Sequence, residues 1–265
     1  MSPDRARQGA YLCISAPPDA AGVLAAPVPA LAERLALQNE FSARDGHPQN
    51  AVAFLRRVES TAGGVEDEGL SAADAIVHVA SDDGFTVAEF CAEVERVLSG
   101  LARVQRLTGR VAPTQYTGGA MHEFAYARQR TQQGGGEMPN AFLLPLRKTP
   151  EWWAKEWMER HTYFLPRYED GRMVSDGHPL AAAAGIPVLM RRTYRCDDGY
   201  DFLTYFECAD EDVATFHAVC ASLRDVQRNP EWRFVREGPT WRGRRMESWS
   251  ALWTPRGPAA AMRDR

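Results

Sequence analysis

Two stretches of the chain share one pattern, in which an alternating hydrophobic run is followed by a run with helical spacing. The first is AIVHVAS (75–81), followed after a turn by TVAEFCAEVERVLSGLARV (86–104). The second is DFLTYFEC (201–208), followed by helical spacing over 212–229. Period two is typical of a strand and period 3.6 of an amphipathic helix, so each stretch predicts a strand and then a helix. The later strand is expected to have two faces, one with Phe202, Thr204 and Phe206 and the other with Leu203, Tyr205 and Glu207.

The tetrads VAEF (87–90) and VATF (213–216) fall at the same place in the two stretches. A repeated strand-helix plan indicates two related halves, each an antiparallel sheet covered by helices on one face, which is the α+β class. Three consecutive glycines between the halves indicate a flexible linker. We therefore expect an N-terminal half at 1–128, a linker at 129–140, a C-terminal half at 141–254 and a frayed tail at 255–265.

The remaining segments carry local signals. TPEWWAKEWMERHTYF (149–164) opens with Thr149 ahead of Pro150, an N-cap followed by proline at the first helical position, and predicts a helix. Short apolar and β-branched runs predict further strands at 11–15, 188–196 and 232–238.

Composition narrows the class of protein. The chain has 265 residues, 45% of them hydrophobic, and a formal net charge of −4, which gives no overall attraction to nucleic acid or an anionic membrane. No apolar run has the length of a membrane span, and the N-terminus lacks the core of a secretory signal, so we expect a cytoplasmic protein. The five cysteines have no metal-binding spacing and are expected to be buried thiols. We find no catalytic-triad motif, phosphate loop or dinucleotide fingerprint.

One stretch, GHPLAAAAGIPVLMRR (177–192), has ionisable side chains only at its two ends. The ordinary interpretation is a helix-capping histidine, a short alanine helix stopped by Gly185 and Pro187, and a strand. The alternative is functional. Methyl side chains leave room for a large planar partner, and His178 and Arg191 would then face one cavity from a helix and a strand. Neutral imidazole is a good axial ligand for haem iron, and a guanidinium holds an anion.

The segment 148–245 as a whole resembles the C-terminal half of the chlorite dismutase family, which are haem proteins built on a dimeric α+β barrel of two ferredoxin-like halves. The matching pieces, in order, are KTPEWW (148–153), the histidine and arginine thirteen residues apart, DFLTYFE (201–207), LRDVQRN (223–229) and EGPTWRGRR (237–245).

The resemblance implies a site and an assembly. His178 would be the proximal ligand of a haem b iron, and Arg191 the mobile distal arginine. Lys148, with Trp152 or Trp153, would lie near the haem propionates. Family members form dimers or pentamers, so a homo-oligomer is expected, and this length fits the longer, pentameric type.

Two positions depart from the family pattern. A glutamate that supports the proximal histidine in chlorite-degrading members is replaced here by Arg228. Asp225, one turn earlier, is the candidate substitute, because residues three apart share a helix face. The catalytic tyrosine of one branch of coproheme decarboxylases corresponds to Leu144, which argues against that activity; Tyr163 and Tyr168 have no positional support as substitutes.

Four functional interpretations stay open. The first is a haem oxidoreductase acting on chlorite or a related small oxidant, with Arg191 retaining hypochlorite while dioxygen and chloride form. The second is a peroxidase-like or specialised-metabolism haem enzyme with a larger substrate. The third is a haem-binding or sensing protein without turnover, and the fourth a barrel without haem.

Other candidate residues are given structural roles. His161, an alternative ligand, is assigned to an amphipathic helix face, and His78 to a half-buried strand position. His47, His122 and His217 have no partner at ligand spacing. The arginines of TWRGRRMESW (240–249) are expected on a solvated or subunit-interface strand rather than in an anion site.

Overall fold

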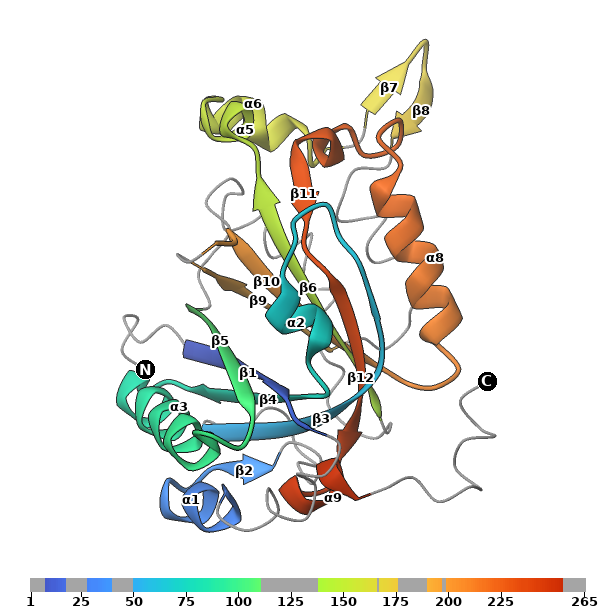
Figure 1. Ribbon diagram of the computed structural model, residues 1–265. Helices are drawn as coiled ribbons and strands as arrows, with labels where there is room; N and C mark the ends of the chain where they lie inside the picture. Colours follow the sequence, from blue (N-terminus) through green and yellow to red (C-terminus); the bar gives the residue numbers. More distant parts are fainter. Residues whose placement is uncertain are drawn as a thin grey trace.

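The computed structural model describes residues 8–17, 28–39, 50–110, 138–165, 167–175, 190–196 and 199–254 (Figure 1). The strands are β1 (Gln8–Ser15), β2 (Gln38–Asn39), β3 (Asn50–Thr61), β4 (Ala75–Ser81), β5 (Arg103–Arg110), β6 (Asn140–Lys148), β7 (Arg167–Glu169), β8 (Arg172–Ser175), β9 (Met190–Arg195), β10 (Phe202–Cys208), β11 (Val235–Glu237) and β12 (Thr240–Met246). The helices are α1 (Val28–Arg34), α2 (Glu68–Ala72), α3 (Gly84–Leu98), α5 (Pro150–Trp153), α6 (Trp157–Thr162), α8 (Val213–Arg224) and α9 (Trp249–Trp253), with a 3₁₀ turn at Pro230–Phe234.

Eight antiparallel strands close into a barrel. The N-terminal half contributes β5-β1-β4-β3 and the C-terminal half contributes β12-β6-β10-β9. If the four strands of each half are numbered along the chain, both sheets have the spatial order 4-1-3-2, which is the order of a ferredoxin-like unit. In both halves a helix, α3 or α8, joins the third strand to the fourth. The predicted α+β class and the two related halves are therefore confirmed.

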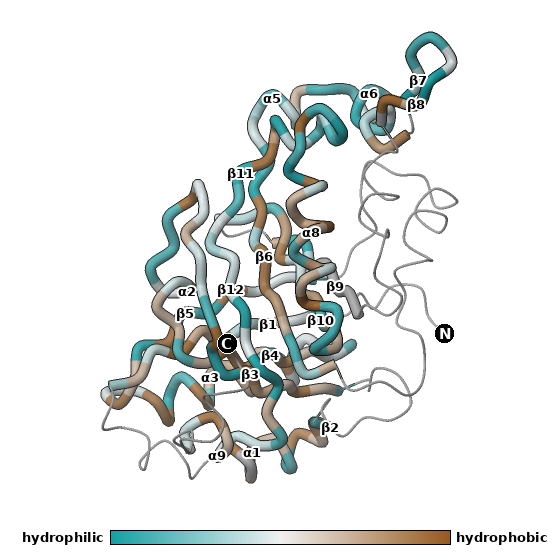
Figure 2. The backbone as a smooth tube through the Cα atoms, turned by 90° about the vertical axis from the view of Figure 1, so that its right-hand side faces the viewer, coloured by the Kyte–Doolittle hydropathy of each residue, from teal (hydrophilic) through white to brown (hydrophobic). Residues whose placement is uncertain are grey.

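Alternating side chains divide the apolar residues between the inside and the outside of the barrel. The inside contains Tyr11, Leu203, Tyr205 and Trp241, each at most 1% exposed. Phe202 and Phe206, on the other face of β10, belong to separate outer clusters, as the sequence pattern predicts. In Figure 2 the hydrophobic residues, in brown, are concentrated on the strands and on one side of the helices' turns, while the hairpin β7–β8 is mainly hydrophilic.

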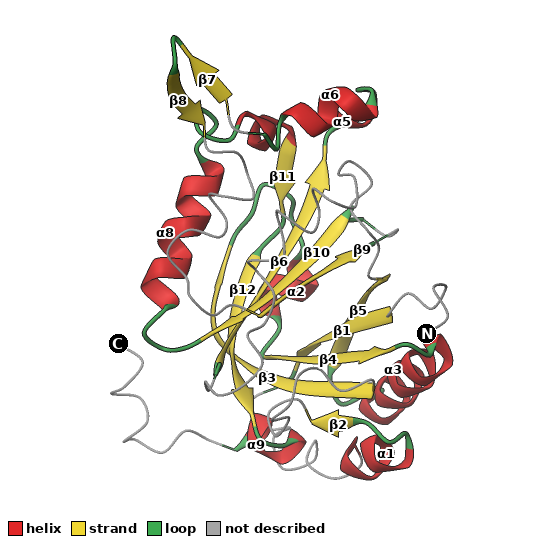
Figure 3. Ribbon diagram, turned by 180° about the vertical axis from the view of Figure 1, so that it is seen from behind, coloured by secondary structure: helices red, strands yellow, loops and turns green. Residues whose placement is uncertain are grey.

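Helices α3 and α8 cover the outer faces of the two sheets, as Figure 3 shows from behind. On the N-terminal half, α3 packs Val87, Phe90 and Val94 against the sheet. On the C-terminal half, α8 packs Phe216 and Cys220 against β6 and β10. None of the helices described is long and apolar enough to cross a membrane. All five cysteines are buried and free, as expected.

His78 is fully buried, at 1% exposure, where the sequence indicated a half-buried position. Both faces of β4 are covered, because one lies under α3 and the other lines the barrel interior. Its ring stacks on Tyr11 with 4.5 Å between centroids, and its Nε2 lies 3.1 Å from the hydroxyl of Tyr194. A buried imidazole with a hydroxyl partner is a structural histidine, which agrees with the role assigned to it.

Three predicted helices are shorter than the sequence pattern indicated. The helix expected over 86–104 ends at Leu98, before Gly100, which has φ 78°, and β5 begins at Arg103. The helix expected over 149–164 is interrupted, because Glu156 is extended and begins α6 as its N-cap. The strand expected over 232–238 is also shorter. Its first residues belong to the 3₁₀ turn that begins at Pro230, and only β11 remains as a strand.

The third shortened helix, α8, changes the interpretation of its end. It stops at Arg224, because the carboxylate of Asp225 accepts a hydrogen bond from the backbone N–H of Gln227 (2.9 Å) and Asn229 Nδ2 donates to the carbonyl of Ser222 (2.9 Å). Arg228 therefore lies beyond the helix and is exposed. The helix-face argument that made Asp225 a substitute for the family glutamate is wrong.

The last helix, α9, follows the C-terminal half in sequence but packs on the N-terminal half. Trp249 is 1% exposed, and its ring lies 6.2 Å from that of Phe54 on β3. Ser248 caps the helix by accepting from the N–H of Ala251 at 3.2 Å. This contact joins the two halves outside the barrel as well as within it.

Replacement Trp249→Ala is expected to lower the free energy of unfolding by about 3–5 kcal/mol, since it removes a buried indole and leaves a cavity. Urea denaturation measures this change. The matched control is Phe85→Ala, because Phe85 is 86% exposed and its loss is expected to cost less than about 1 kcal/mol. Equal effects of the two substitutions would contradict the docking of α9.

Candidate functional site

Of the two residues predicted to bind iron and substrate, His178 and Arg191, the structure describes only part. His178 lies outside the described residues. Arg191 lies in β9, and its backbone is paired with Phe206 of β10, but its side chain is outside the described part. Their assignment as ligand and distal arginine stays a prediction.

Lys148 lies at the end of β6 in a buried cluster. β11 pairs with β6 and places Val235 opposite Lys148, which brings the preceding 3₁₀ turn, with Glu231, against the lysine. Lys148 Nζ makes an ion pair with Glu231 and lies 4.4 Å from the centre of the Trp152 ring. The backbone N–H of Lys148 donates to Asp201 Oδ2 at 2.6 Å. The lysine is thus held from three sides.

Burial determines the electrostatics of this cluster. The side chains of Lys148 and Glu231 are 2% and 4% exposed. Burial lowers the pKa of Lys148 from its ordinary value, and the attraction of Glu231 opposes that shift. The ammonium therefore already has a carboxylate partner inside the chain. The role of Lys148 beside a propionate stays a prediction.

Trp153, next in sequence to Trp152, has a different environment. Its half-buried ring lies 5.4 Å from the guanidinium carbon of Arg160 on α6 and 5.6 Å from that of Arg195 on β9. The ring of Phe202 lies 6.4 Å away. Within the described residues, Arg160 Nε is buried and has no hydrogen-bond partner. We call Trp153, Arg160 and Arg195 the Trp153 cluster.

The Trp153 cluster has the chemistry of a site for a carboxylate group. Two guanidiniums beside an indole provide charge and directed N–H donors, and the unsatisfied Arg160 Nε is a donor in need of an acceptor. The sequence analysis missed Arg160 and Arg195. A signal for Arg160 was present, because it lies seven residues, or two helical turns, after Trp153.

The outer face of the same sheet is apolar between this cluster and α8. Phe142, Leu144 and Phe206 form one cluster with Phe216 of α8, and the rings of Phe142 and Phe216 are 4.2 Å apart. Leu144 is 7% exposed, so the position of the decarboxylase tyrosine is a packing position here. Asp225 and Arg228 lie beyond the end of α8 and not on the helix.

The arginines of β12 form intramolecular ion pairs. Arg242 Nη1 lies 3.2 Å from Glu59, Arg245 Nη1 lies 2.8 Å from Glu207, and Arg244 pairs with Asp210. Their side chains are at most 30% exposed. The expectation of a solvated strand is thus corrected, because acidic residues of β3, β10 and the following turn face this strand.

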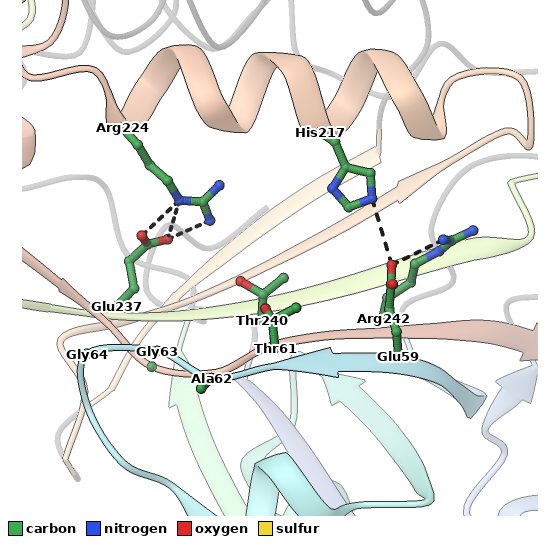
Figure 4. Close-up of a pocket in the computed structure, with 11 residues that line it drawn as sticks. Glu59, Thr61, Ala62, Gly63, Gly64, His217, Arg224, Glu237, Thr240 and Arg242 are labelled. Carbon is green, nitrogen blue, oxygen red and sulfur yellow. Dashed lines mark hydrogen bonds and ion pairs between the residues drawn. The ribbon is translucent and has the colours of Figure 1, made fainter.

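A cavity of about 400 Å³ lies between α8, β3 and β12 (Figure 4). Arg224 makes a bidentate ion pair with Glu237, with a shortest distance of 2.7 Å. His217 Nε2 lies 3.8 Å from Glu59, so this histidine has a partner that sequence spacing did not reveal. The opposite charges are matched, and among the described residues no group of three or more His, Cys, Asp or Glu could hold a metal ion.

Several solved structures of chlorite dismutases have the same fold. A tryptophan variant of the enzyme from Candidatus Nitrospira defluvii in complex with cyanide superposes with a TM-score of 0.67 at 19% identity, covering 94% of each chain. An arginine-to-lysine variant of that enzyme gives 0.67 at 18% identity, and its imidazole complex 0.66 at 19%, each covering 94% of both chains. No protein-family model matches the sequence. No curated protein is similar to it in sequence. The chain therefore has the chlorite dismutase fold.

Replacement Glu231→Gln is expected to lower the free energy of unfolding at pH 7 by about 3–5 kcal/mol, because it leaves the Lys148 charge buried without its partner. The substitution lowers the folded-state pKa of Lys148 further. At pH values between this pKa and the ordinary lysine pKa, Lys148 carries a proton in the unfolded chain but not in the folded chain. The loss should shrink as the pH rises toward the ordinary lysine pKa.

Urea denaturation between pH 6 and pH 10 measures this dependence. The control is Glu159→Gln, which removes the exposed partner of Lys155 and should cost less than about 1 kcal/mol at every pH. A pH-independent loss in Glu231→Gln would contradict a charged, buried Lys148.

Proposed function

We propose that this chain is a haem b-dependent oxidoreductase that degrades chlorite or a related small oxidant. The fold supports the proposal, and so does one contact. Arg195 of β9 lies 5.6 Å from Trp153, which joins the KTPEWW segment to the strand that carries Arg191. Two segments that carry the family resemblance, some forty residues apart in the chain, thus meet at one edge of the C-terminal sheet.

The bound haem would supply the iron for oxygen-atom chemistry. The chain would supply its placement. His178 would ligate the iron, the Trp153 cluster would hold the propionates, and the part of the apolar outer face of β6 and β10 that α8 leaves uncovered would exclude water from the ring. Arg191 keeps its positive charge at every physiological pH, so it would bind the anionic substrate and retain the anionic product.

Coproheme decarboxylation is the weaker candidate. Leu144 has no group that can be oxidised or can transfer a proton, and it is packed against α8 rather than open to a cavity. A peroxidase-like activity, or haem binding without turnover, would use the same haem-binding residues, and the substrate experiments below distinguish them.

A homo-oligomer is part of the proposal. Exposed apolar side chains gather on α6 and on the hairpin β7–β8, which projects at one end of the molecule (Figure 1): Trp157, Met158, Tyr168 and Met173 are each at least 52% exposed. Contact with further copies of the chain would remove this surface from water.

Replacement His178→Ala is expected to abolish the haem Soret band of the purified protein and to prevent haem uptake in titrations. His217→Ala is the matched control, because His217 lies in the charged cavity beside α8 and should keep the band. Loss of the band in His161→Ala instead would assign the ligand to α6 and contradict His178.

Replacement Arg191→Ala is expected to leave haem binding intact and to lower oxygen release from chlorite about 100-fold or more, the cost of removing one fixed charge from a reaction centre. An oxygen electrode gives the rate, and Arg167→Ala, on the exposed hairpin, is the control. If the parent protein binds haem but releases no oxygen from chlorite and turns over peroxide instead, the peroxidase-like alternative holds.

Replacement Arg160→Gln is expected to weaken haem binding about 10- to 100-fold, because a charge-assisted hydrogen bond contributes about 1.5–3 kcal/mol. Haem titration followed at the Soret band measures this. Arg172→Gln, in the exposed hairpin, should bind haem as the parent does. An unchanged haem affinity of the Arg160→Gln variant would show that the Trp153 cluster does not hold the cofactor.

A further inference from the structure

The barrel closes at two seams of very different length. Between β3 and β12 the register extends from Thr240 to Met246. Between β5 and β9 a single residue pair joins the strands, Arg110 opposite Arg195. The short seam is therefore held by few backbone hydrogen bonds, and its two facing residues carry the same charge.

Like charges at directly opposite positions destabilise a pair of strands. Neither arginine is neutralised within the part of the chain that the structure describes. Arg110 makes no hydrogen bond or ion pair there, and Arg195 contacts only the ring of Trp153. Every arginine of β12, by contrast, faces a carboxylate. The seam thus has two uncompensated positive charges.

Both guanidinium-bearing residues line a cavity of about 350 Å³, which has the size of a small-molecule site. Val87 and Cys91 of α3 form an apolar side, and Gly84, the first residue of α3, lies at the cavity next to the N-cap Asp83, whose carboxylate accepts from the N–H of Phe85 at 3.1 Å. Arg106 also lines the cavity, but its charge is balanced by Glu95 at 2.7 Å.

The backbone at the seam leaves little room for anything but glycine. A Cβ on Gly109 would lie 2.8 Å from the carbonyl oxygen of Arg195 and 2.7 Å from Cβ of Tyr194. The close approach of β5 and β9 therefore keeps the two arginines at one wall of the cavity.

We propose that this cavity, the seam pocket, binds a small oxyanion, a phosphate or carboxylate group, between Arg110 and Arg195. The bound anion neutralises both guanidiniums and so stabilises closure of the barrel. Arg195 is shared with the Trp153 cluster, whereas Arg110, Gly84 and α3 belong to the N-terminal half, so substitutions at Arg110 test the seam pocket without changing that cluster.

Thermal unfolding of the full-length protein tests the proposal, in inorganic phosphate and in chloride of equal ionic strength. Phosphate is expected to raise the Tm of the parent protein by about 2–4 °C above chloride. Arg110→Gln should unfold at a higher Tm than the parent in chloride, because the repulsion is gone, and should lose the phosphate-specific increase. Arg103→Gln, on the same strand and paired with exposed Glu68, should respond to phosphate as the parent does.

Two further measurements complete the test. Arg110→Glu, which places a carboxylate opposite Arg195, should raise the Tm in chloride and abolish the phosphate response. Succinate in place of phosphate distinguishes carboxylate from phosphate ligands, and calorimetric titration detects binding directly. An undiminished phosphate response in Arg110→Gln would assign the effect to general salt exclusion and overturn the proposal, as would a lower Tm of that variant in chloride.

Discussion

Closure of the barrel is the constraint on which the other features depend. β10 pairs with both β6 and β9, so the C-terminal sheet is continuous, and the long register of β3 with β12 joins it to the N-terminal sheet. Once the ring is closed, the side chains on one face of every strand must fill its interior. Trp241 and Tyr205 occupy that space, and the indole N–H of Trp241 donates to the carbonyl of Ala73 at 3.0 Å.

The filled interior places any functional site on the outer faces. A barrel of this size, packed with aromatic side chains, has no room for a cofactor. The outer face of the N-terminal sheet is covered by α1, α3 and α9, whereas α8 covers only part of the C-terminal sheet (Figure 3). The Trp153 cluster lies at the edge of that second sheet, where strand ends from β6 and β9 meet helices α5 and α6.

Charge pairing divides the cations of the described residues into two groups. Lys148, Arg224 and the arginines of β12 each face a carboxylate, and these pairs specify how helices and turns dock on the sheet. Arg110 has no such partner among the described residues, and Arg160 and Arg195 have none except an aromatic ring. The sequence alone does not distinguish these groups, because Arg160, Arg195 and Arg224 all have an acidic residue within two positions in the chain. Only the register of the strands decides which carboxylate lies opposite.

Hydrophobic period by itself determined the two halves, the faces of β10 and the helices α3 and α8, since period depends on local backbone geometry. The segments that carry the family resemblance were also visible in the sequence, including Lys148 and the pair His178 and Arg191. The ends of the helices were not visible in the sequence. The end of α8, for example, depends on hydrogen bonds that the side chains of Asp225 and Asn229 make with the backbone in competition with the helix. Tertiary structure alone decided that Glu231 neutralises Lys148, that Trp153 meets Arg195, and that Arg110 faces Arg195, since these contacts join residues from separate elements through strand pairing and packing.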